Sequence, residues 1–246
     1  EDGYSPAFSV GSIVSSGSLG IIMPPSIILI VYGVTVDQSI GKLFMAGVLP
    51  AFFLGGLLMA VTYVAAVRGG HKRQPMAPLS EVWSSFKDAS WGLFVIVIVI
   101  GGIYGGIFTP TEAAAVSAVY AFFTVKFIYR DLSWKEIPQV IKTSAATAAM
   151  IMFIIANAMI FAHLLTTEQM PQNLANWIIS LNLNVYMFLI FLNLLLLLAG
   201  NFMEPSSLIM ILAPLIFPIA VQLGVDPIHL GVIITVNMEI GMLTPP

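Results

Sequence analysis

The chain has 246 residues, of which 59% are apolar and 9% are charged, and its formal net charge is −3. Soluble globular domains carry about 25% charged residues, so this chain has too few to coat a water-facing surface and is expected to lie in a lipid bilayer. The small net charge indicates no nucleic-acid partner, and the absence of cysteine excludes disulfides and thiolate metal sites.

The first predicted element is a helix that breaks before it crosses the membrane. Ser5 is a suitable N-cap residue, and Pro6 is preset for the first helical position. The apolar run that follows covers only about half to two-thirds of a bilayer before it meets Gly20 and Pro24-Pro25. A second helix over Ser26 to Val36 can return to the same side. The pattern predicts a re-entrant hairpin whose two helices pack side by side, with a tip buried in protein or facing a wet cavity.

Several apolar runs follow, and they are too long for the strands of a membrane barrel. Ser80 to Ala89 is predicted to be a separate amphipathic helix at the membrane surface. A break is predicted at Gly47 to Pro50, and two more at Gly105 to Glu112 and Gly200 to Pro205. The chain is therefore expected to be an all-α polytopic membrane protein. The predicted membrane helices are Leu43 to Val67, Trp91 to Phe108, Ala113 to Ile128, Ile137 to Leu165, Val185 to Ala199 and Leu208 to Val221.

The pattern of the first element recurs at the end of the chain. With one offset and no gap, the matching pairs are Gly3 and Gly224, Ser5 and Asp226, Pro6 and Pro227, Gly20 and Gly241, and Pro24-Pro25 and Pro245-Pro246. Two equivalent broken elements in the two halves of a membrane chain indicate the binding site of a transporter. The alternative is that glycine and proline only kink two ordinary membrane helices.

Two carboxylates, Glu204 and Glu239, lie in apolar surroundings, where ionisable residues are functional candidates. The alternatives are that Glu239 makes a hydrogen bond that fixes its hairpin and that Glu204 lies at a helix end. Neither a nucleophile paired with a base nor a phosphate-binding loop is evident, so an enzyme is not expected. An intramembrane enzyme and a channel are the alternatives from other functional classes.

Three stretches together resemble the large membrane subunit of TRAP transporters, the tripartite ATP-independent periplasmic family. They are Ser16 to Ser26, Gly101 to Ala113 and Asp226 to Pro246. The resemblance covers essentially the whole sequence. The start at Glu1 without a methionine and the end at a proline pair suggest an internal piece of a longer chain.

The resemblance implies an inverted-repeat, ion-transporter-like fold with two re-entrant hairpins and broken helices. It implies import of an organic acid, such as a dicarboxylate or sialic acid, with sodium ions and without an organic cofactor. The expected partners are a periplasmic substrate-binding protein and a small membrane subunit, separate or fused. The expected location is the cytoplasmic (inner) membrane of a bacterium or archaeon, and the expected movement is elevator-like. A carboxylate carrier that needs no binding protein is the alternative within transporters.

The same resemblance divides the chain by role. Residues 1–67 are assigned to a transport domain with the first hairpin, and residues 68–90 to an interfacial arm. Residues 91–182 are assigned to scaffold helices with a second arm, and residues 183–246 to transport-domain helices with the first arm of a truncated second hairpin.

Hydroxyls and the carbonyls freed at helix breaks are oxygen donors that suit sodium, and the resemblance favours this role at the predicted breaks. The candidate residues for sodium or substrate are Ser15, Ser16, Gly17, Ser18, Gly20, Gly47, Gly105, Gly106, Thr109, Pro110, Asn237, Gly241 and Thr244. The candidate sodium ligands among them are Ser16, Ser18, Gly106, Thr109 and Gly241. The alternatives are close helix packing by small residues, a proline kink after Gly47, and a surface loop in which Thr109 or Thr111 caps the next helix.

Overall fold

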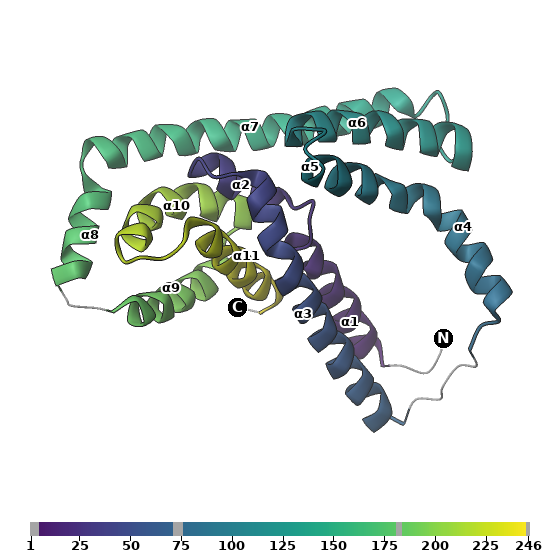
Figure 1. Ribbon diagram of the computed structural model, residues 1–246, viewed down its shortest axis with the longest axis horizontal. Helices are drawn as coiled ribbons and strands as arrows, with labels where there is room; N and C mark the ends of the chain where they lie inside the picture. The colour runs from purple at the N-terminus through teal and green to yellow at the C-terminus, as the bar shows by residue number, and fades with distance from the viewer. Residues whose placement is uncertain (1–4, 71–75, 181–183, 245–246) are drawn as a thin grey trace. The chain divides into compact units, whose positions relative to one another are not determined.

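A computed structural model of the chain describes residues 5–70, 76–180 and 184–244 (Figure 1). It divides the chain into two compact units. The first unit is Glu1–His71 with Ile151–Pro246, and the second is Lys72–Met150. Gly3 and the Pro245-Pro246 pair of the predicted repeat lie outside the described residues.

Both copies of the repeat begin as the sequence predicts. Helix α1 (Pro6–Ser18) starts after Ser5, whose hydroxyl accepts a hydrogen bond from the backbone N–H of Phe8 at 3.3 Å. Helix α11 (Pro227–Leu243) starts after Asp226, whose carboxylate accepts backbone N–H bonds of 2.9 Å from Ile228 and His229. The caps satisfy backbone donors that a helix start leaves free, so each half-helix is defined by its own local sequence.

The predicted break after α1 is present, but the hairpin's two helices are arranged differently. Helix α1 passes into a short 3₁₀ turn (Leu19–Ile21), and helix α2 (Ile27–Thr35) starts after Ser26, whose hydroxyl also donates to the carbonyl of Ile21. The prediction that the two helices pack side by side is wrong, because α1 packs on helices α3 (Ile40–Arg68) and α11, whereas α2 packs on α10 (Pro205–Gln222), α3 and α11. Helix α2 buries Leu29 and Tyr32 fully, whereas Ser18 is the buried residue of α1, whose Val10, Ile13 and Val14 remain exposed.

Helix α3 is continuous, so the predicted break at Gly47 to Pro50 is wrong. A proline in a membrane helix removes one backbone donor, and neighbouring groups can absorb this loss without unwinding the helix. Gly47 lies opposite the first tip, which is the turn from Gly17 to Pro25. Gly47 is buried, and a Cβ atom there would lie 2.9 Å from the carbonyl oxygen of Ile22.

The core of the first unit forms around α11. This helix lies between α3 and helix α9 (Val185–Gly200) and also contacts α2 and α10 (Figure 1). Leu230, Ile234 and Met238 are almost completely buried along it. The Tyr32 hydroxyl donates to the carbonyl of Pro227 at 2.8 Å, which ties α2 to the start of α11.

Helix α7 (Ile137–Thr167) matches the long predicted run, but the following helix, α8 (Met170–Ser180), was missed. Helix α8 has polar residues among its apolar ones and packs on α10. Its short, mixed sequence lacks the length of a membrane-spanning run, which was the signal used to find the other helices.

The second unit contains a pair of packed helical segments. Helix α4 (Leu79–Ile96), a π-helical stretch (Val97–Gly101) and α5 (Gly102–Tyr104) form one run, so the predicted surface helix is not separate from the span. Helix α6 (Pro110–Phe123) continues as a π-helical stretch (Thr124–Tyr129). The Tyr129 hydroxyl donates to the carbonyl of Asp88 at 2.7 Å and accepts the Gly92 N–H at 3.1 Å, which fastens the two segments together.

Among the described residues, five helical runs are long and apolar enough to cross a membrane: Ile40–Arg68, Leu79–Tyr104, Pro110–Tyr129, Ile137–Thr167 and Pro205–Gln222. Many large apolar side chains along them are exposed, as expected where lipid rather than water is the solvent. The prediction of an all-α polytopic membrane protein is therefore confirmed.

Candidate ion and substrate site at the helix breaks

The second predicted tip packs against the break between α9 and α10. Gly241 of α11 faces Gly200, the last residue of α9. A Cβ atom on Gly241 would lie 3.0 Å from the Gly200 Cα atom, so the two backbones approach as closely as only glycine allows. The carbonyls at the end of α11 are therefore held beside the Asn201–Glu204 segment.

Two asparagines hold this contact together. Asn237 is buried and donates from its amide nitrogen to Asn193 of α9 at 2.6 Å and to the carbonyl of Ile233 at 2.8 Å. Asn201, with its amide turned so that its nitrogen faces the acceptors, donates to the carbonyls of Gly241 at 2.7 Å and Thr244 at 3.0 Å. Because Asn237 and Gly241 are four residues apart, they share the face of α11 that packs on α9.

The first tip meets the second through a buried hydrogen bond. The Ser18 hydroxyl lies 3.1 Å from Oε1 of Glu239 and 2.8 Å from the carbonyl oxygen of Ser15. Glu239 is only 3% exposed, and its second oxygen, Oε2, has no hydrogen-bond partner among the described residues. The interpretation of Glu239 as a residue that fixes its hairpin is thus supported, because the carboxylate joins the tips of both repeats.

The remaining candidates at the first tip lie on other faces of α1 and the turn. The Ser16 hydroxyl is exposed and donates to the carbonyls of Ser12 at 2.7 Å and Ile13 at 3.1 Å, within its own helix. Ser15 and Ser16 line a groove between α1 and α3. Gly17 and Gly20 are exposed, and a Cβ atom on either would meet nothing within 4 Å. Of the first-tip candidates, Ser18 is therefore the one whose side chain forms a hydrogen bond with the described part of α11.

At the central break, the predicted capping of the next helix by Thr109 is confirmed. Thr109 forms a capping box with Glu112: its hydroxyl accepts the Glu112 N–H at 3.3 Å, and the carboxylate accepts the Thr109 N–H at 2.8 Å. Gly105 and Gly106 form the turn before it, with Gly106 at a φ of +67°, and Pro110 begins α6. These residues belong to the second unit, so their approach to the second tip stays a prediction.

Glu204 lies at a helix end, as one interpretation proposed. Its carboxylate caps α10 by accepting backbone N–H bonds from Ser206 at 3.0 Å and Ser207 at 2.8 Å. A negatively charged side chain at this position is stabilised by the positive end of the helix dipole. Glu204 thus has a structural role in shaping the break that receives Gly241.

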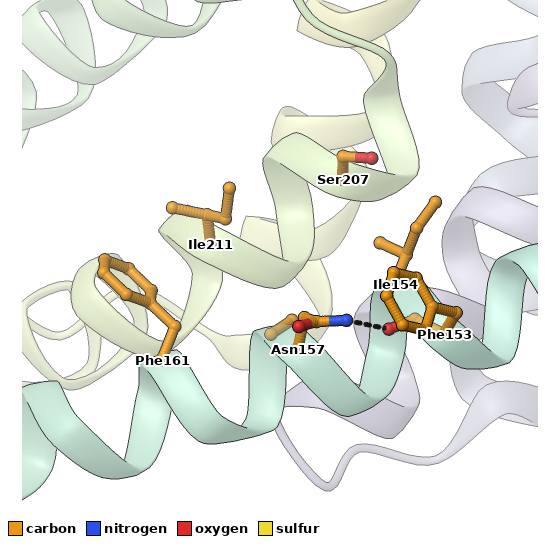
Figure 2. Close-up of a pocket in the computed structure, with 7 residues that line it drawn as sticks. Phe153, Ile154, Asn157, Phe161, Ser207 and Ile211 are labelled. Atoms are coloured by element: carbon orange, nitrogen blue, oxygen red, sulfur yellow. Dashed lines mark hydrogen bonds between the residues drawn. The ribbon is translucent and has the colours of Figure 1, made fainter.

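One pocket in the first unit lies between α7 and α10 and is lined by mostly apolar side chains, including Phe153, Phe161 and Ile211 (Figure 2). Its amide, on Asn157, donates to the carbonyl of Phe153 in its own helix at 2.7 Å. None of the predicted site residues lines this pocket, so it is separate from the cluster around the tips.

Sequence interpretation missed three residues of this cluster: Asn193, Gly200 and Asn201. Gly200 and Asn201 were noticed only as part of a break, and Asn193 was not noticed at all. An amide in the middle of the apolar run Val185 to Ala199 was the available signal, because polar side chains in membrane helices usually bond across a helix interface.

Comparison with known proteins places the chain in a family. The profile of the family described as "Tripartite ATP-independent periplasmic transporter, DctM component" matches residues 1–246. The C4-dicarboxylate TRAP transporter large permease protein of Pseudomonas aeruginosa is 54% identical over 244 residues, which cover 99% of this chain and 57% of that protein.

Two other relatives carry different substrate names. The isethionate TRAP transporter permease of Oleidesulfovibrio alaskensis is 40% identical over 251 residues, 100% of this chain and 39% of that protein. The sialic acid TRAP transporter large permease of Vibrio cholerae is 37% identical over 243 residues, 99% of this chain and 57% of that protein. All three relatives are named transporter permeases, which are not enzymes. The chain belongs to the DctM-component family of TRAP transporters, and it spans little more than half the length of the large permeases that it matches.

Proposed function

We propose that this chain forms the ion- and substrate-binding part of a sodium-coupled secondary transporter that imports an organic acid. The observation that carries the proposal is the contact between the two broken repeats, in which Ser18 of the first tip meets Glu239 of the second. Equivalent broken helices that meet inside a membrane protein surround the binding site in transporters built from repeats. Family membership supports the same function.

The proposed ions are sodium. Their proposed ligands are oxygen atoms of Ser16, Ser18 and Gly241 in the first unit and, separately, of Gly106 and Thr109 in the second unit. The carbonyls near Gly241 lie at the C-terminal end of α11, where the helix dipole favours a cation. The substrate carboxylate is proposed to be met by the hydroxyls and N–H groups at the breaks. The proposed site residues in the first unit are Ser15, Gly17, Gly20, Gly47, Asn237 and Thr244, and the candidates in the second unit are Gly105 and Pro110.

A C4-dicarboxylate is the first substrate to test. Three relatives with this name are 54%, 48% and 46% identical to the chain, whereas relatives named for isethionate and sialic acid are 40% and 37% identical. The proposed partners are a periplasmic substrate-binding protein, which delivers the acid, and a small membrane subunit, which is either a separate chain or fused to this one. The proposed location is the cytoplasmic membrane, with elevator-like movement of the domain that carries the tips.

Uptake into proteoliposomes tests this function. The full-length large subunit is reconstituted with its small subunit, and labelled C4-dicarboxylate is supplied with or without the binding protein and an inward sodium gradient. We expect saturable uptake that needs both. Uptake without the binding protein would identify a different type of carboxylate carrier, and non-saturating flux without a gradient would identify a channel.

The serines of the first tip provide a sharper test of sodium binding. Ser16→Ala and Ser18→Ala each remove one hydroxyl while keeping the small side chain that packing requires. For the buried Ser18, loss of a polar interaction costs about 1–3 kcal/mol, which corresponds to a sodium response roughly 5- to 150-fold weaker. The exposed Ser16 should show a smaller change in the same direction. Uptake at rising sodium concentration measures the change, and high sodium should restore it at least in part. Ser12→Ala, one turn earlier on α1, is the matched control. An unchanged sodium response in both variants would show that these serines serve packing only.

A further inference from the structure

The hydrogen bond between Ser18 and Glu239 joins two equivalent positions of the internal repeat. The two residues are separated by 221 positions. The same offset relates Ser5 to Asp226, which cap the two half-helices, and Gly20 to Gly241. When a two-fold axis relates two copies of a motif, a residue that contacts the equivalent residue of the other copy lies at that axis. The two tips therefore meet at the point where the repeats are related to each other.

The two equivalent positions carry different side chains with complementary chemistry. The Ser18 hydroxyl donates and the Glu239 carboxylate accepts, so the hydrogen bond has a fixed direction. Two identical carboxylates at these positions would both be acceptors and would form no bond. Ser16 is equivalent to Asn237 by the same offset, yet these residues do not share a bond, since Asn237 pairs with Asn193 of α9 and Ser16 bonds within α1. The bridge is thus specific to one pair.

Glu239 is an unusual residue to place at such a contact. It is only 3% exposed, and Oε2 accepts no hydrogen bond within the described part of the chain. A buried, unsatisfied polar atom is unfavourable by roughly the free energy of a lost hydrogen bond, and an apolar side chain of similar shape would avoid that penalty. A contact that served only to pack the helices would not require a hydrogen-bond acceptor at this position.

The register of α11 connects this contact to the ion site. Glu239 lies between Asn237 and Gly241, whose side of the helix packs on α9, while Glu239 itself faces Ser18 of α1. One turn of helix therefore holds the first tip on one face and the α9–α10 break on the other. Displacement of Ser18 would be passed to Gly241 through this single rigid turn.

We propose that Glu239 is a positioning residue that holds the Ser18 hydroxyl in place for sodium binding and thereby makes the two tips respond to sodium as one unit. The inference rests on the proposed sodium-coupled function. Glu239 acts through the bond that it accepts from Ser18 and is not itself a ligand of the ion.

A double-mutant cycle on the full-length transporter tests this role. The variants are Ser18→Ala, Glu239→Leu and the two combined, with Glu239→Gln as the conservative variant and Ile240→Val as a control on the exposed side of the same turn. Residues in direct contact couple by about 2- to 150-fold in an equilibrium constant. We therefore expect each single variant to raise the sodium concentration for half-maximal uptake several-fold, and the double variant to be no worse than the poorer single one. Glu239→Gln keeps an acceptor for the Ser18 hydroxyl and should stay close to the unaltered protein.

Thermal unfolding of the same variants in sodium-free buffer separates the possible outcomes. Non-additive shifts of Tm together with non-additive sodium responses support the proposal. Coupling in Tm but not in the sodium response would show a merely structural bond and overturn it. Independent effects of the two substitutions would also overturn it, that is, Tm shifts that add and changes in half-maximal sodium concentration that multiply. A Glu239→Gln variant as poor as Glu239→Leu would overturn it too. If uptake by the unaltered transporter does not depend on sodium, the proposed function fails as well. The unaltered protein shows this without any variant, so the two failures can be told apart.

Discussion

Gly231→Ala should destabilise the transporter, although alanine normally favours a helix. A Cβ atom at this position of α11 would lie 2.6 Å from Cε1 of Tyr32 and 2.8 Å from Cδ2 of Leu43. Both neighbours are fully buried, so the Tyr32 ring must move and its 2.8 Å hydrogen bond to the Pro227 carbonyl is strained or lost. Overpacking costs about 1–3 kcal/mol and the hydrogen bond about 1 kcal/mol, against a gain of about 1 kcal/mol in helix propensity.

The expected net loss is about 2 kcal/mol, which should lower Tm by a few degrees, the shift per kcal/mol being smaller in a longer protein. Thermal unfolding of the purified full-length protein in detergent measures it. Gly11→Ala is the matched control, because Gly11 is also inside a helix and a Cβ atom there meets nothing within 4 Å. A Tm for Gly231→Ala equal to or above that of Gly11→Ala would mean that α2, α3 and α11 do not pack as described.

Gly241→Ala should abolish most of the uptake with a smaller effect on stability. The added Cβ atom would lie 3.0 Å from the Gly200 Cα atom and 3.1 Å from its carbonyl carbon. These are backbone atoms, so no side-chain rotation can relieve the contact, and the second tip must move away from the α9–α10 break. A displacement of about 1 Å at a binding site can lower activity by about 100-fold.

Initial rates of sodium-driven uptake measure this effect, at matched amounts of protein in the vesicles. Gly56→Ala on α3 is the control, since a Cβ atom there meets nothing within 4 Å. Uptake by Gly241→Ala within threefold of that control would exclude the close contact of Gly200 and Gly241 from the transport mechanism.

The local parts of this structure were predictable from sequence because their causes are local. The side chains of Ser5 and Asp226 accept hydrogen bonds from backbone N–H groups two or three residues ahead. The prolines that follow them have no backbone N–H that would need a partner at the helix start. The same holds for the break before Pro110, where Thr109 and Glu112 cap each other. The continuity of α3 through Pro50 was missed because the effect of a proline depends on its neighbours in space.

The pairing of helices was much harder to predict. The α9 sequence is apolar on every side, so hydrophobic periodicity does not mark the face that α11 covers. That face is marked instead by small and polar residues: Asn237 and Gly241, four apart on α11, meet Asn193 and Gly200 of α9. Glu239 and Ser18 were each recognised as candidates from the sequence. Their pairing was not predicted, because it depends on how the two tips lie in space.

The separation of 221 residues between Ser18 and Glu239 also has a consequence for how the chain is made. During synthesis the first tip enters the membrane long before the helix that carries Glu239 exists, because domains assemble in the order in which they emerge. Until then the Ser18 hydroxyl has an acceptor in its own helix, the carbonyl of Ser15 at 2.8 Å, so it can insert without an unsatisfied donor. The hydrogen bond to Glu239 is then among the last to form. A ribosome-stalled chain that ends before Asp226 should therefore insert with Ser18 bonded only within its own helix.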